Sequence, residues 1–261
     1  MSKMRQPAIH DRKGEPRSEL TTLSYDFPAN FTVPPHYHMV DQLVFARSGV
    51  MTVRTEHGVW VVPPLRAAWI PHKVVHSINM LGVVSMRTIY FARLFVKRAP
   101  GNCTVLNVSP LLRELILHAC GFPRLRKRIP HERRLIELIV DQFEASKAIP
   151  LQLPHPSDSR AKRVAETLFN DPTDSRRLEN ICRDCGASKR TIERLFLEQT
   201  TMTLGRWRQQ LRLLHGLRAL ALGSKVTSAA LDAGYNSPSA FIAAFRKSMG
   251  FTPKRYYDAV N

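Results

Sequence analysis

The amino-acid sequence predicts a multidomain α+β protein with a β-rich first part, two helices after it, and an all-α last part of about seven helices. Three observations lead to this fold class. Short runs rich in Val, Ile, Trp and Phe alternate with turn-forming residues up to about residue 96. A proline-rich stretch follows the two helices, and the last third of the chain contains one helix pattern twice.

The β-rich part is expected over residues 20–100, after a polar, charged and flexible tail over residues 1–19. Its apolar runs are short, and breakers such as Pro34-Pro35 and Ser48-Gly49 separate them. Several short strands with frequent turn signals are typical of an all-β sandwich or barrel, so we expect that architecture here.

Two amphipathic helices are expected at residues 109–119 and 131–146, within a helical region over residues 101–147. Each carries apolar residues three and four positions apart, which places them on one face. That face can pack wholly on the β-rich part, or it can join two copies of the chain in a homodimer. The pattern leaves both arrangements open.

A linker between domains is expected over residues 148–159, because Pro150, Pro154 and Pro156 prevent a helix from propagating. The remainder, residues 160–261, has a helical pattern throughout. Its helices are expected at residues 160–170, 178–184, 188–199, 204–222, 226–233, 238–249 and 253–259.

The repeated pattern runs from Leu178 to Phe196 in its first copy and from Val226 to Phe245 in its second. Each copy has a short helix, a glycine, and a second helix that begins after a serine, Ser188 or Ser237. This order is typical of a helix-turn-helix, and two tandem copies indicate DNA binding more strongly than one. The helix between them spans roughly 28 Å, which would place the second helices of both copies about one DNA turn apart.

The chain is strongly basic, with a formal net charge of +18, which favours a polyanionic partner such as double-stranded DNA. Residues 1–155 hold 21 Lys and Arg against 11 Asp and Glu, and residues 156–261 hold 18 against 10. Because both halves share the excess, the arrangement of residues must identify the DNA-binding part. No apolar run is long enough for a membrane span and the four cysteines form no disulfide framework, so we expect a cytoplasmic protein.

Three segments of the last third resemble the AraC/XylS family of bacterial transcription regulators. They read Gly-Arg-Trp-Arg-Gln-Gln-Leu-Arg from Gly205, Ala-Gly-Tyr-Asn-Ser-Pro-Ser-Ala-Phe-Ile-Ala-Ala-Phe-Arg from Ala233, and Gly-Phe-Thr-Pro-Lys-Arg-Tyr from Gly250. The resemblance covers residues 160–258 and implies a seven-helix DNA-binding domain that controls specific promoters. It further implies an activator or a repressor, with RNA polymerase as a partner, and no enzyme activity.

The first copy is predicted to read DNA bases with Lys189, Arg190, Glu193 and Arg194. Its apolar residues share the opposite face of the helix, which leaves these four for the major groove. Arginine can donate two hydrogen bonds to guanine, and glutamate can accept one from cytosine. An acidic side chain in this set weighs against a binder of phosphates without sequence preference.

The second copy presents Ser239, Ala240 and Ala243 at the equivalent base-facing positions. These small side chains discriminate poorly between bases. We therefore expect the second copy to provide grip on the DNA backbone and the first to provide specificity. The residues expected to contact phosphates are Ser237, Arg246, Lys247 and Arg206.

A pair of cysteines in the first copy, Cys182 and Cys185, has the spacing of half a zinc site. The second copy has Ala230 and Ala233 at the corresponding positions. Such positions pack one helix on another and need small side chains, and cysteine serves as a small buried apolar residue. We therefore expect both cysteines to pack helices.

The β-rich part contains His36, His38, Gln42 and His76, which resemble the two motifs of a cupin barrel. The resemblance implies the ligand set of metal-binding cupins, in which three histidines and a glutamate hold a divalent ion. In this chain Gln42 stands at the glutamate position. Three imidazoles suit zinc, nickel or iron, and His72 is a further nearby candidate. The loss of the carboxylate favours a pocket for a small effector without metal, and no cofactor is expected.

The resemblance to cupin sensors implies that a small effector of unknown identity binds in the barrel. The residues expected to line that pocket are Phe45, Arg54, Trp60, Arg66 and Trp69. A rival function is a metal-dependent cupin enzyme, such as an oxygenase or isomerase, fused to DNA-binding helices. Glutamine in place of the carboxylate disfavours this rival, because the usual base is missing.

Overall fold

The computed structural model describes residues 19–92 and 95–258. Of the tail expected over residues 1–19, only Glu19 lies within the described residues, where it begins the first strand. Within the described residues, no helix is both long enough and apolar enough to cross a membrane.

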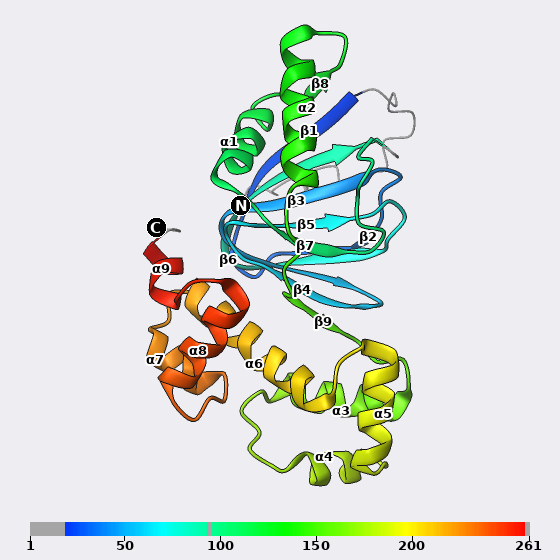
Figure 1. The fold of residues 1–261 in the computed structure, drawn as a ribbon, viewed down its shortest axis with the longest axis vertical. Helices are drawn as coiled ribbons and strands as arrows, with labels where there is room; N and C mark the ends of the chain where they lie inside the picture. Colours follow the sequence, from blue (N-terminus) through cyan, green and yellow to red (C-terminus); the bar gives the residue numbers. More distant parts are fainter. Residues whose placement is uncertain (1–18, 93–94, 259–261) are drawn as a thin grey trace, which may run out of the picture. The chain divides into compact units, whose positions relative to one another are not determined.

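The chain divides into two compact units. The first unit contains the chain up to Thr55 together with Val62–Ile149. The second contains Glu56–Val61 and the chain from Pro150 onward. The mixed fold class is confirmed in its coarse form, since a β-sheet unit precedes a helical unit that carries the helix-turn-helix pattern (Figure 1).

An antiparallel sheet forms the framework of the first unit, with strand order β7-β5-β3-β6-β1-β8 and with β2 beside β6 (Figure 1). The bounds are β1 Glu19–Phe27, β2 Thr32–His36, β3 Asp41–Thr55, β5 Arg66–Ile70, β6 His76–Phe91, β7 Thr104–Asn107 and β8 Arg124–Arg126. The sequence predicted a break between strands at Ser48-Gly49, but β3 continues through these residues. The register shifts there, and Gly49 has φ 76° with no room for a Cβ, which is the geometry of a β-bulge.

Helices α1 (Pro110–Ala119) and α2 (Pro130–Glu144) cover one face of this sheet (Figure 1). Their buried residues join the sheet in one apolar core, because alternate side chains of a strand point to the same face. Main contributors to this core are Leu43, Phe45, Trp69, Ile89, Phe91, Leu112, Ile116, Ile136, Ile139 and Phe143. Two of the residues expected to line an effector pocket, Phe45 and Trp69, therefore belong to the core beneath the helices instead.

The helical region expected over residues 101–147 is also corrected, because β7 and β8 lie within it. Strand β8 pairs antiparallel with β1, so that Leu125 stands opposite Leu20. Leu125 is fully buried between two exposed arginines. This short basic segment has little β preference of its own, and it forms a strand because it pairs with the edge of the sheet.

The proline-rich linker expected over residues 148–159 contains a short strand, β9 (Gln152–Pro154), which pairs with β4 (Gly58–Val62). A Cβ on Gly58 would lie 2.7 Å from the carbonyl oxygen of Leu153, so glycine permits this pairing. Proline is tolerated at the end of β9 because a terminal position needs no further N–H donor.

The second unit contains the helices predicted for the last third of the chain, with nearly the same ends. They are α3 Ser159–Asn170, α4 Leu178–Asp184, α5 Lys189–Thr200, α6 Leu204–Ala221, α7 Val226–Asp232, α8 Pro238–Met249 and α9 Pro253–Asp258. Helix α6 connects the two helix-turn-helix copies, and Trp207 near its start packs edge-on against Phe196 of α5. The Trp207 indole N–H donates to the carbonyl of Pro154 at 2.8 Å, which ties β9 to this unit.

Candidate nucleic-acid interface and a buried histidine cluster

The two helix-turn-helix copies have the same local construction. In the first, Gly186 at the turn has φ 84°, and Ser188 Oγ accepts a hydrogen bond from the Thr191 N–H at 3.2 Å. In the second, Gly234 has φ 77°, and Ser237 Oγ caps the following helix in the same way. Glycine permits the left-handed turn and serine satisfies a free N–H, so both second helices begin at a defined residue.

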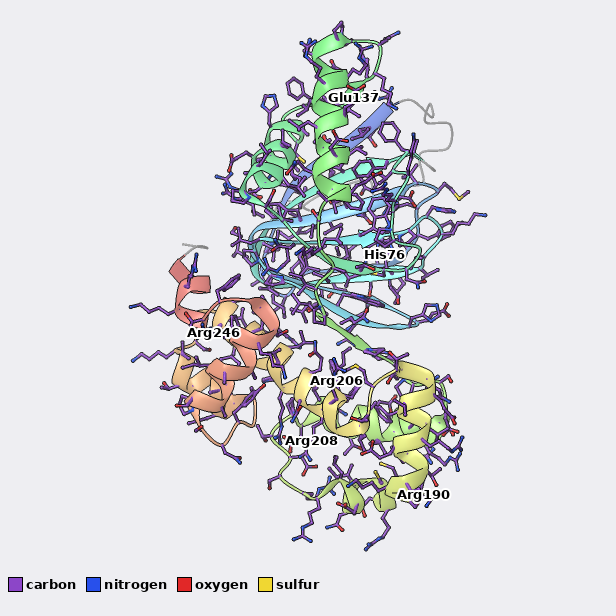
Figure 2. The ribbon with its side chains drawn as sticks, viewed as in Figure 1. His76, Glu137, Arg190, Arg206, Arg208 and Arg246 are labelled. Atoms are coloured by element: carbon purple, nitrogen blue, oxygen red, sulfur yellow. The ribbon has the colours of Figure 1, made fainter. Side chains whose placement is uncertain are left out.

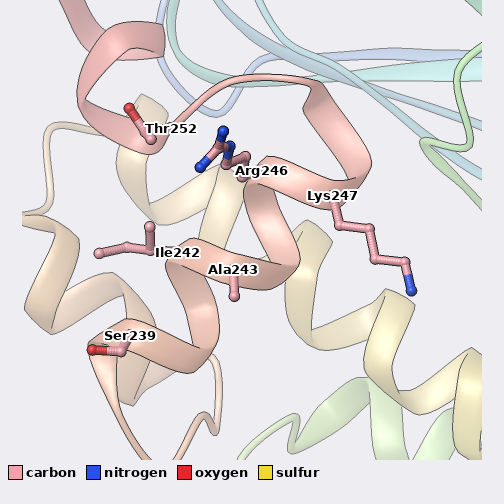
Figure 3. Close-up of a pocket in the computed structure, with 6 residues that line it drawn as sticks. All are labelled: Ser239, Ile242, Ala243, Arg246, Lys247 and Thr252. Atoms are coloured by element: carbon pink, nitrogen blue, oxygen red, sulfur yellow. The ribbon is translucent and has the colours of Figure 1, made fainter.

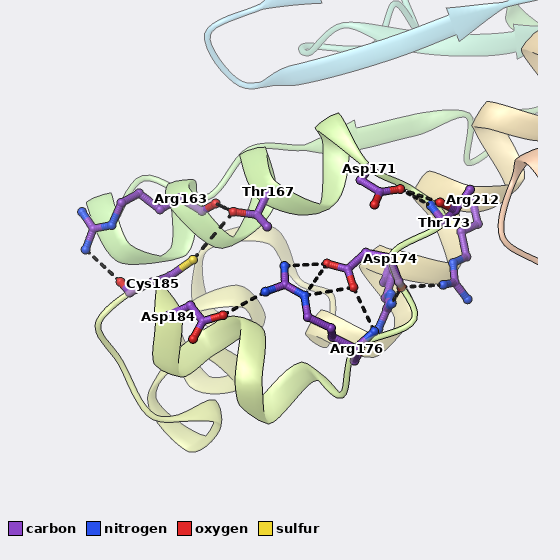
Figure 4. Close-up of polar contacts among 10 residues, drawn as sticks. Arg163, Thr167, Asp171, Thr173, Asp174, Arg176, Asp184, Cys185 and Arg212 are labelled. Carbon is purple, nitrogen blue, oxygen red and sulfur yellow. Dashed lines mark hydrogen bonds and ion pairs between the residues drawn. The ribbon is translucent and has the colours of Figure 1, made fainter.

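Cys182 and Cys185 are buried within the first copy. Burial raises the pKa of the Cys182 thiol to about 11, and Cys185 Sγ lies 3.8 Å from Thr167 Oγ1 (Figure 4). Among the described residues, neither belongs to a group of three or more side chains placed to hold a metal. Their burial is what the packing interpretation requires.

Three basic residues of α5 have different surroundings. Lys189 Nζ lies 2.7 Å from Glu179, and Arg194 lies 2.8 Å from Glu198 one turn along the helix. Arg190 is exposed, and none of the interactions found among the described residues involves its guanidinium (Figure 2). Exposed ion pairs are weak, so a nucleic acid can compete with Glu179 for Lys189 and with Glu198 for Arg194. Arg190 can contact a nucleic acid without first breaking an ion pair.

Glu193 is turned away from the exposed face on which the sequence placed it. The side chain is half-buried, and its Oε2 accepts a hydrogen bond from the Leu204 N–H at 3.0 Å. This N–H belongs to the first turn of α6, where backbone donors lack helical partners and a carboxylate is favoured. The structure therefore uses Glu193 to join the ends of α5 and α6, and we do not retain it among the base-reading residues.

The exposed face of α8 in the second copy forms an open groove (Figure 3). Its apolar lining includes Ala243 and Ile242, and its basic lining includes Arg246 and Lys247. Ser239 and Thr252 complete the lining, and Ala240 is exposed beside it. Arg206, the other residue expected to contact phosphates, is exposed in the first turn of α6 (Figure 2).

Two arginines of α6, Arg208 and Arg212, hold the loop between α3 and α4, and Figure 4 shows Arg212 beside this loop. Arg212 donates to the carbonyls of Pro172 at 2.9 Å and Asp174 at 3.1 Å. Arg208 donates to the carbonyl of Asp174 and, at 3.2 Å, to that of Arg176. The loop that precedes the first copy is thereby attached to the connecting helix through backbone groups.

Asp174 organises this loop from within. Its buried carboxylate accepts from Arg176 at 2.7 Å, and that hydrogen bond holds the pKa of Asp174 below its usual value. Arg176 also pairs with Asp184 of α4 at 2.9 Å (Figure 4). The sequence analysis missed this network, although the four-residue spacing of two arginines on one helix was a usable signal.

His36, His38 and His76 come together in the first unit, with ligand atoms within 4.8 Å of one another. His36 and His76 stand opposite each other on β2 and β6, and His38 follows just beyond the end of β2. Although β2 ends at His36, the rings of His36 and His38 are 4.9 Å apart. Burial lowers the pKa of His76 to about 3, so its imidazole is neutral near pH 7.

Gln42 is buried at the start of β3, directly opposite Tyr90 of β6. Opposite residues of an antiparallel pair point to the same face, and the Tyr90 ring lies 5.0 Å from that of His38. Gln42 is therefore on the face that carries the histidines. His72 is occupied elsewhere, since its backbone and ring both approach the carboxylate of Asp41.

The remaining residues expected to line a pocket have other surroundings. Arg66 is buried and donates to the Asn107 side chain at 2.8 Å. Trp60 is buried in β4, and Arg54 is exposed.

Comparison with known proteins places the chain among transcription regulators. Residues 181–259 match the family model of a helix-turn-helix domain. The HTH-type transcriptional regulator NimR of Escherichia coli (strain K12) is 34% identical over 225 residues, which are 86% of this chain and 82% of NimR. The regulator RipA of Corynebacterium glutamicum is 31% identical over 103 residues, covering 40% of this chain and 31% of RipA.

Among solved structures, the chain is similar to ToxT from Vibrio cholerae, with a TM-score of 0.40, 14% sequence identity, and coverage of 93% of this chain and 98% of ToxT. Another is the DNA-binding domain of AdpA in complex with a target DNA, with a TM-score of 0.37 and 27% identity over 40% of this chain and 93% of that domain.

Proposed function

Because this chain belongs to the AraC/XylS family of DNA-binding transcriptional regulators, we propose that its two helix-turn-helix copies contribute unequally to promoter recognition. Helix α5 of the first copy reads bases, and helix α8 of the second copy holds the DNA backbone. The observation that carries this proposal is the contrast between the exposed basic face of α5 and the small and apolar side chains that line the groove of α8.

Base reading is assigned to Arg190 and Arg194, with Lys189 at the start of the helix. Arg190 is free to approach a base edge, and an arginine that donates two hydrogen bonds to guanine contributes about 1–3 kcal/mol of discrimination. When DNA binds, Arg194 leaves its exposed ion pair with Glu198 and contacts the DNA instead. Glu193 supports this helix from behind through its bond to α6.

Backbone contact is assigned to Ser237, Arg246, Lys247 and Arg206. The first turn of α8 offers free N–H groups that suit a phosphate oxygen, and its last turn carries the two basic side chains. Ala243, Ser239 and Ala240 allow the helix to approach the groove closely, where they can contact a thymine methyl group.

The first unit is proposed to be the sensor, with a cupin-like sheet that binds a small effector. Several buried polar atoms lack hydrogen-bond partners among the described residues, and they include Thr52 Oγ1 and Thr88 Oγ1 of the long strands. Such atoms are costly to bury unless water or a ligand satisfies them. An effector that binds one conformation better than another would then shift the population competent to bind DNA.

We also propose two protein partners, a second copy of the chain and RNA polymerase. Leu111 of α1 and Leu138 of α2 are 48% and 40% exposed, which supports the use of these helices in a homodimer. Sedimentation of the purified chain tests that state. RNA polymerase is the expected partner at the promoter.

The experiment compares Arg190→Ala, Arg194→Ala and Lys247→Ala on an operator selected from random-sequence DNA and on a scrambled version, at two salt concentrations. We expect the α5 variants to lose discrimination by about 1–3 kcal/mol. Lys247→Ala should weaken binding to both DNAs equally. It should also reduce the slope of log affinity against log salt concentration by about one.

Lys147→Ala removes an exposed charge outside both copies and serves as the control. Equal loss of discrimination in the α5 and α8 variants would overturn the unequal roles. Wild-type protein that does not distinguish the two DNAs would overturn sequence-specific regulation itself.

A further inference from the structure

We propose that His36, His38 and His76, together with Gln42, form a binding site for a divalent transition-metal ion such as Zn²⁺ or Ni²⁺. This inference goes beyond the proposed DNA-binding function and does not depend on it. It concerns the first unit alone. The orientation of the imidazoles, their spacing, and the burial of polar atoms without partners among the described residues support this site.

The hydrogen bonds of two histidines determine which nitrogen faces the site. His36 Nδ1 lies 2.8 Å from the carbonyl oxygen of Pro34, and His76 Nδ1 lies 2.9 Å from that of Val74. A carbonyl oxygen can only accept, so each Nδ1 carries the proton and donates it. Each Nε2 therefore keeps its lone pair, and metal-binding histidines are commonly oriented through such a bond to a carbonyl.

The spacing of the three side chains fits one ion after a small adjustment. Their ligand atoms lie within 4.8 Å of one another, which sets an upper limit on each separation. Nitrogen ligands of tetrahedral zinc lie about 2.0–2.1 Å from the metal, which corresponds to roughly 3.4 Å between nitrogens. Small rotations of the rings can supply the remaining contraction, because His36 and His76 lie on paired strands and His38 follows two residues after the end of β2.

Burial gives the second, independent indication of a ligand. His76 and Gln42 are each 2% exposed, and among the described residues His76 Nε2 and Gln42 Oε1 have no hydrogen-bond partner. An unsatisfied buried acceptor destabilises the fold. Both atoms are electron-pair donors without a proton, which is what a bound cation requires of its ligands.

The donor set indicates the class of ion. Imidazole nitrogen suits zinc, nickel, copper and iron, whereas Mg²⁺ and Ca²⁺ prefer oxygen ligands. A neutral amide oxygen completes the set more weakly than a carboxylate would. We therefore expect selective binding of transition metals, with an affinity that a carboxylate at position 42 would increase.

The test uses the full chain purified through a tag without histidines and with no added metal. Elemental analysis should find one zinc, nickel or iron per chain, or Co²⁺ added to metal-free protein should produce the visible absorption of a nitrogen-ligated site. Mg²⁺ at the same concentration should not compete.

His38→Ala and His76→Ala should each weaken Co²⁺ binding by more than roughly tenfold, since even outer-shell changes reduce metal affinity 10–100-fold. His131→Ala, an exposed histidine of α2, should leave Co²⁺ binding unchanged. Gln42→Glu should strengthen it, and this variant keeps the test decisive if an alanine variant fails to fold.

Circular dichroism and thermal melting of every variant accompany the titrations. Zn²⁺ should raise the Tm of the wild-type chain and leave that of folded His76→Ala unchanged. The proposal is overturned if the wild-type chain neither retains a metal nor binds Co²⁺, or if both alanine variants bind as tightly as His131→Ala.

Discussion

The first helix-turn-helix copy and the second share a scaffold and differ in what they expose. Ile192 and Phe196 are fully buried in α5, as Phe241 and Phe245 are in α8. The exposed face of α5 is basic and partly engaged in ion pairs, whereas that of α8 is a groove whose lining includes small and apolar side chains. Core positions of a repeat are thus constrained by packing, while surface positions are free to adopt a separate chemistry for each copy.

The two copies also differ in how they are held. Glu193 connects the first copy to the long helix through a hydrogen bond, and two arginines of α6 hold the loop that precedes this copy. The second copy packs on the same helix through apolar contact, since a Cβ on Gly216 would meet the Phe241 ring at 2.5 Å. Polar attachment suits a copy whose orientation determines which bases it reads, because hydrogen bonds are directional.

The largest expected effect tests whether the two cores are equivalent. Phe196→Ala and Phe245→Ala should each lower the free energy of unfolding by about 3–5 kcal/mol, because each leaves a cavity in a closed core. Urea denaturation monitored by circular dichroism measures the loss. Leu197→Ala on the exposed side of α5 is the control and should change little. A loss in one copy alone would mean that the shared scaffold is not equally packed.

An intermediate effect tests the polar attachment. Arg212→Ala removes hydrogen bonds to the carbonyls of Pro172 and Asp174, and bonds from charged donors contribute about 1.5–3 kcal/mol. Pro172 also approaches Gly234 of the second copy, where a Cβ would lie 2.7 Å from its carbonyl oxygen. The variant should therefore lose more affinity for DNA with both half-sites than for either half-site alone.

Gln209→Ala changes an exposed side chain of the same helix and is the matched control for Arg212→Ala. Fluorescence anisotropy with full and half operators measures the difference. Equal loss of affinity on full and half operators would assign the arginine a role in stability only.

The smallest expected effect compares the helix caps. Ser188→Ala and Ser237→Ala should each cost about 1 kcal/mol of stability, because one N–H at the start of α5 or α8 loses its acceptor. Ser188→Gly and Ser237→Gly are the controls and should cost only a few tenths of that amount. Thermal melting resolves the order, and alanine variants as stable as the glycine variants would argue against side-chain capping in either copy.

Much of the helical unit could be predicted from the sequence, because its signals are local. Apolar periodicity, the capping serines and the glycine turns lie within a few residues of the helices they define. The resemblance of the segments from Gly205, Ala233 and Gly250 identified the family that the comparisons support. The burial of Cys182 and Cys185 also followed from the alignment of the two copies.

The sheet unit was less predictable, because strand pairing joins residues far apart in the chain. Strand β8 and strand β9 exist through partners roughly a hundred residues away in sequence. The face assignment of Phe45 and Trp69 likewise depends on where α1 and α2 pack. The turn signals at Ser48-Gly49 predicted two separate strands, but the chain forms one strand with a bulge at Gly49.

Local signals in the sequence were enough to predict the mixed fold class, the tandem helix-turn-helix and the residue types available to contact DNA. Which of those side chains are free depends on the packing of the folded chain. Arg190 remains exposed while Glu193 caps α6, and three histidines separated by up to forty residues meet with Gln42 on one face of the sheet. The physical reason is that helix periodicity and capping act within a turn or two, whereas hydrogen-bond partners and burial depend on which distant segments pack together.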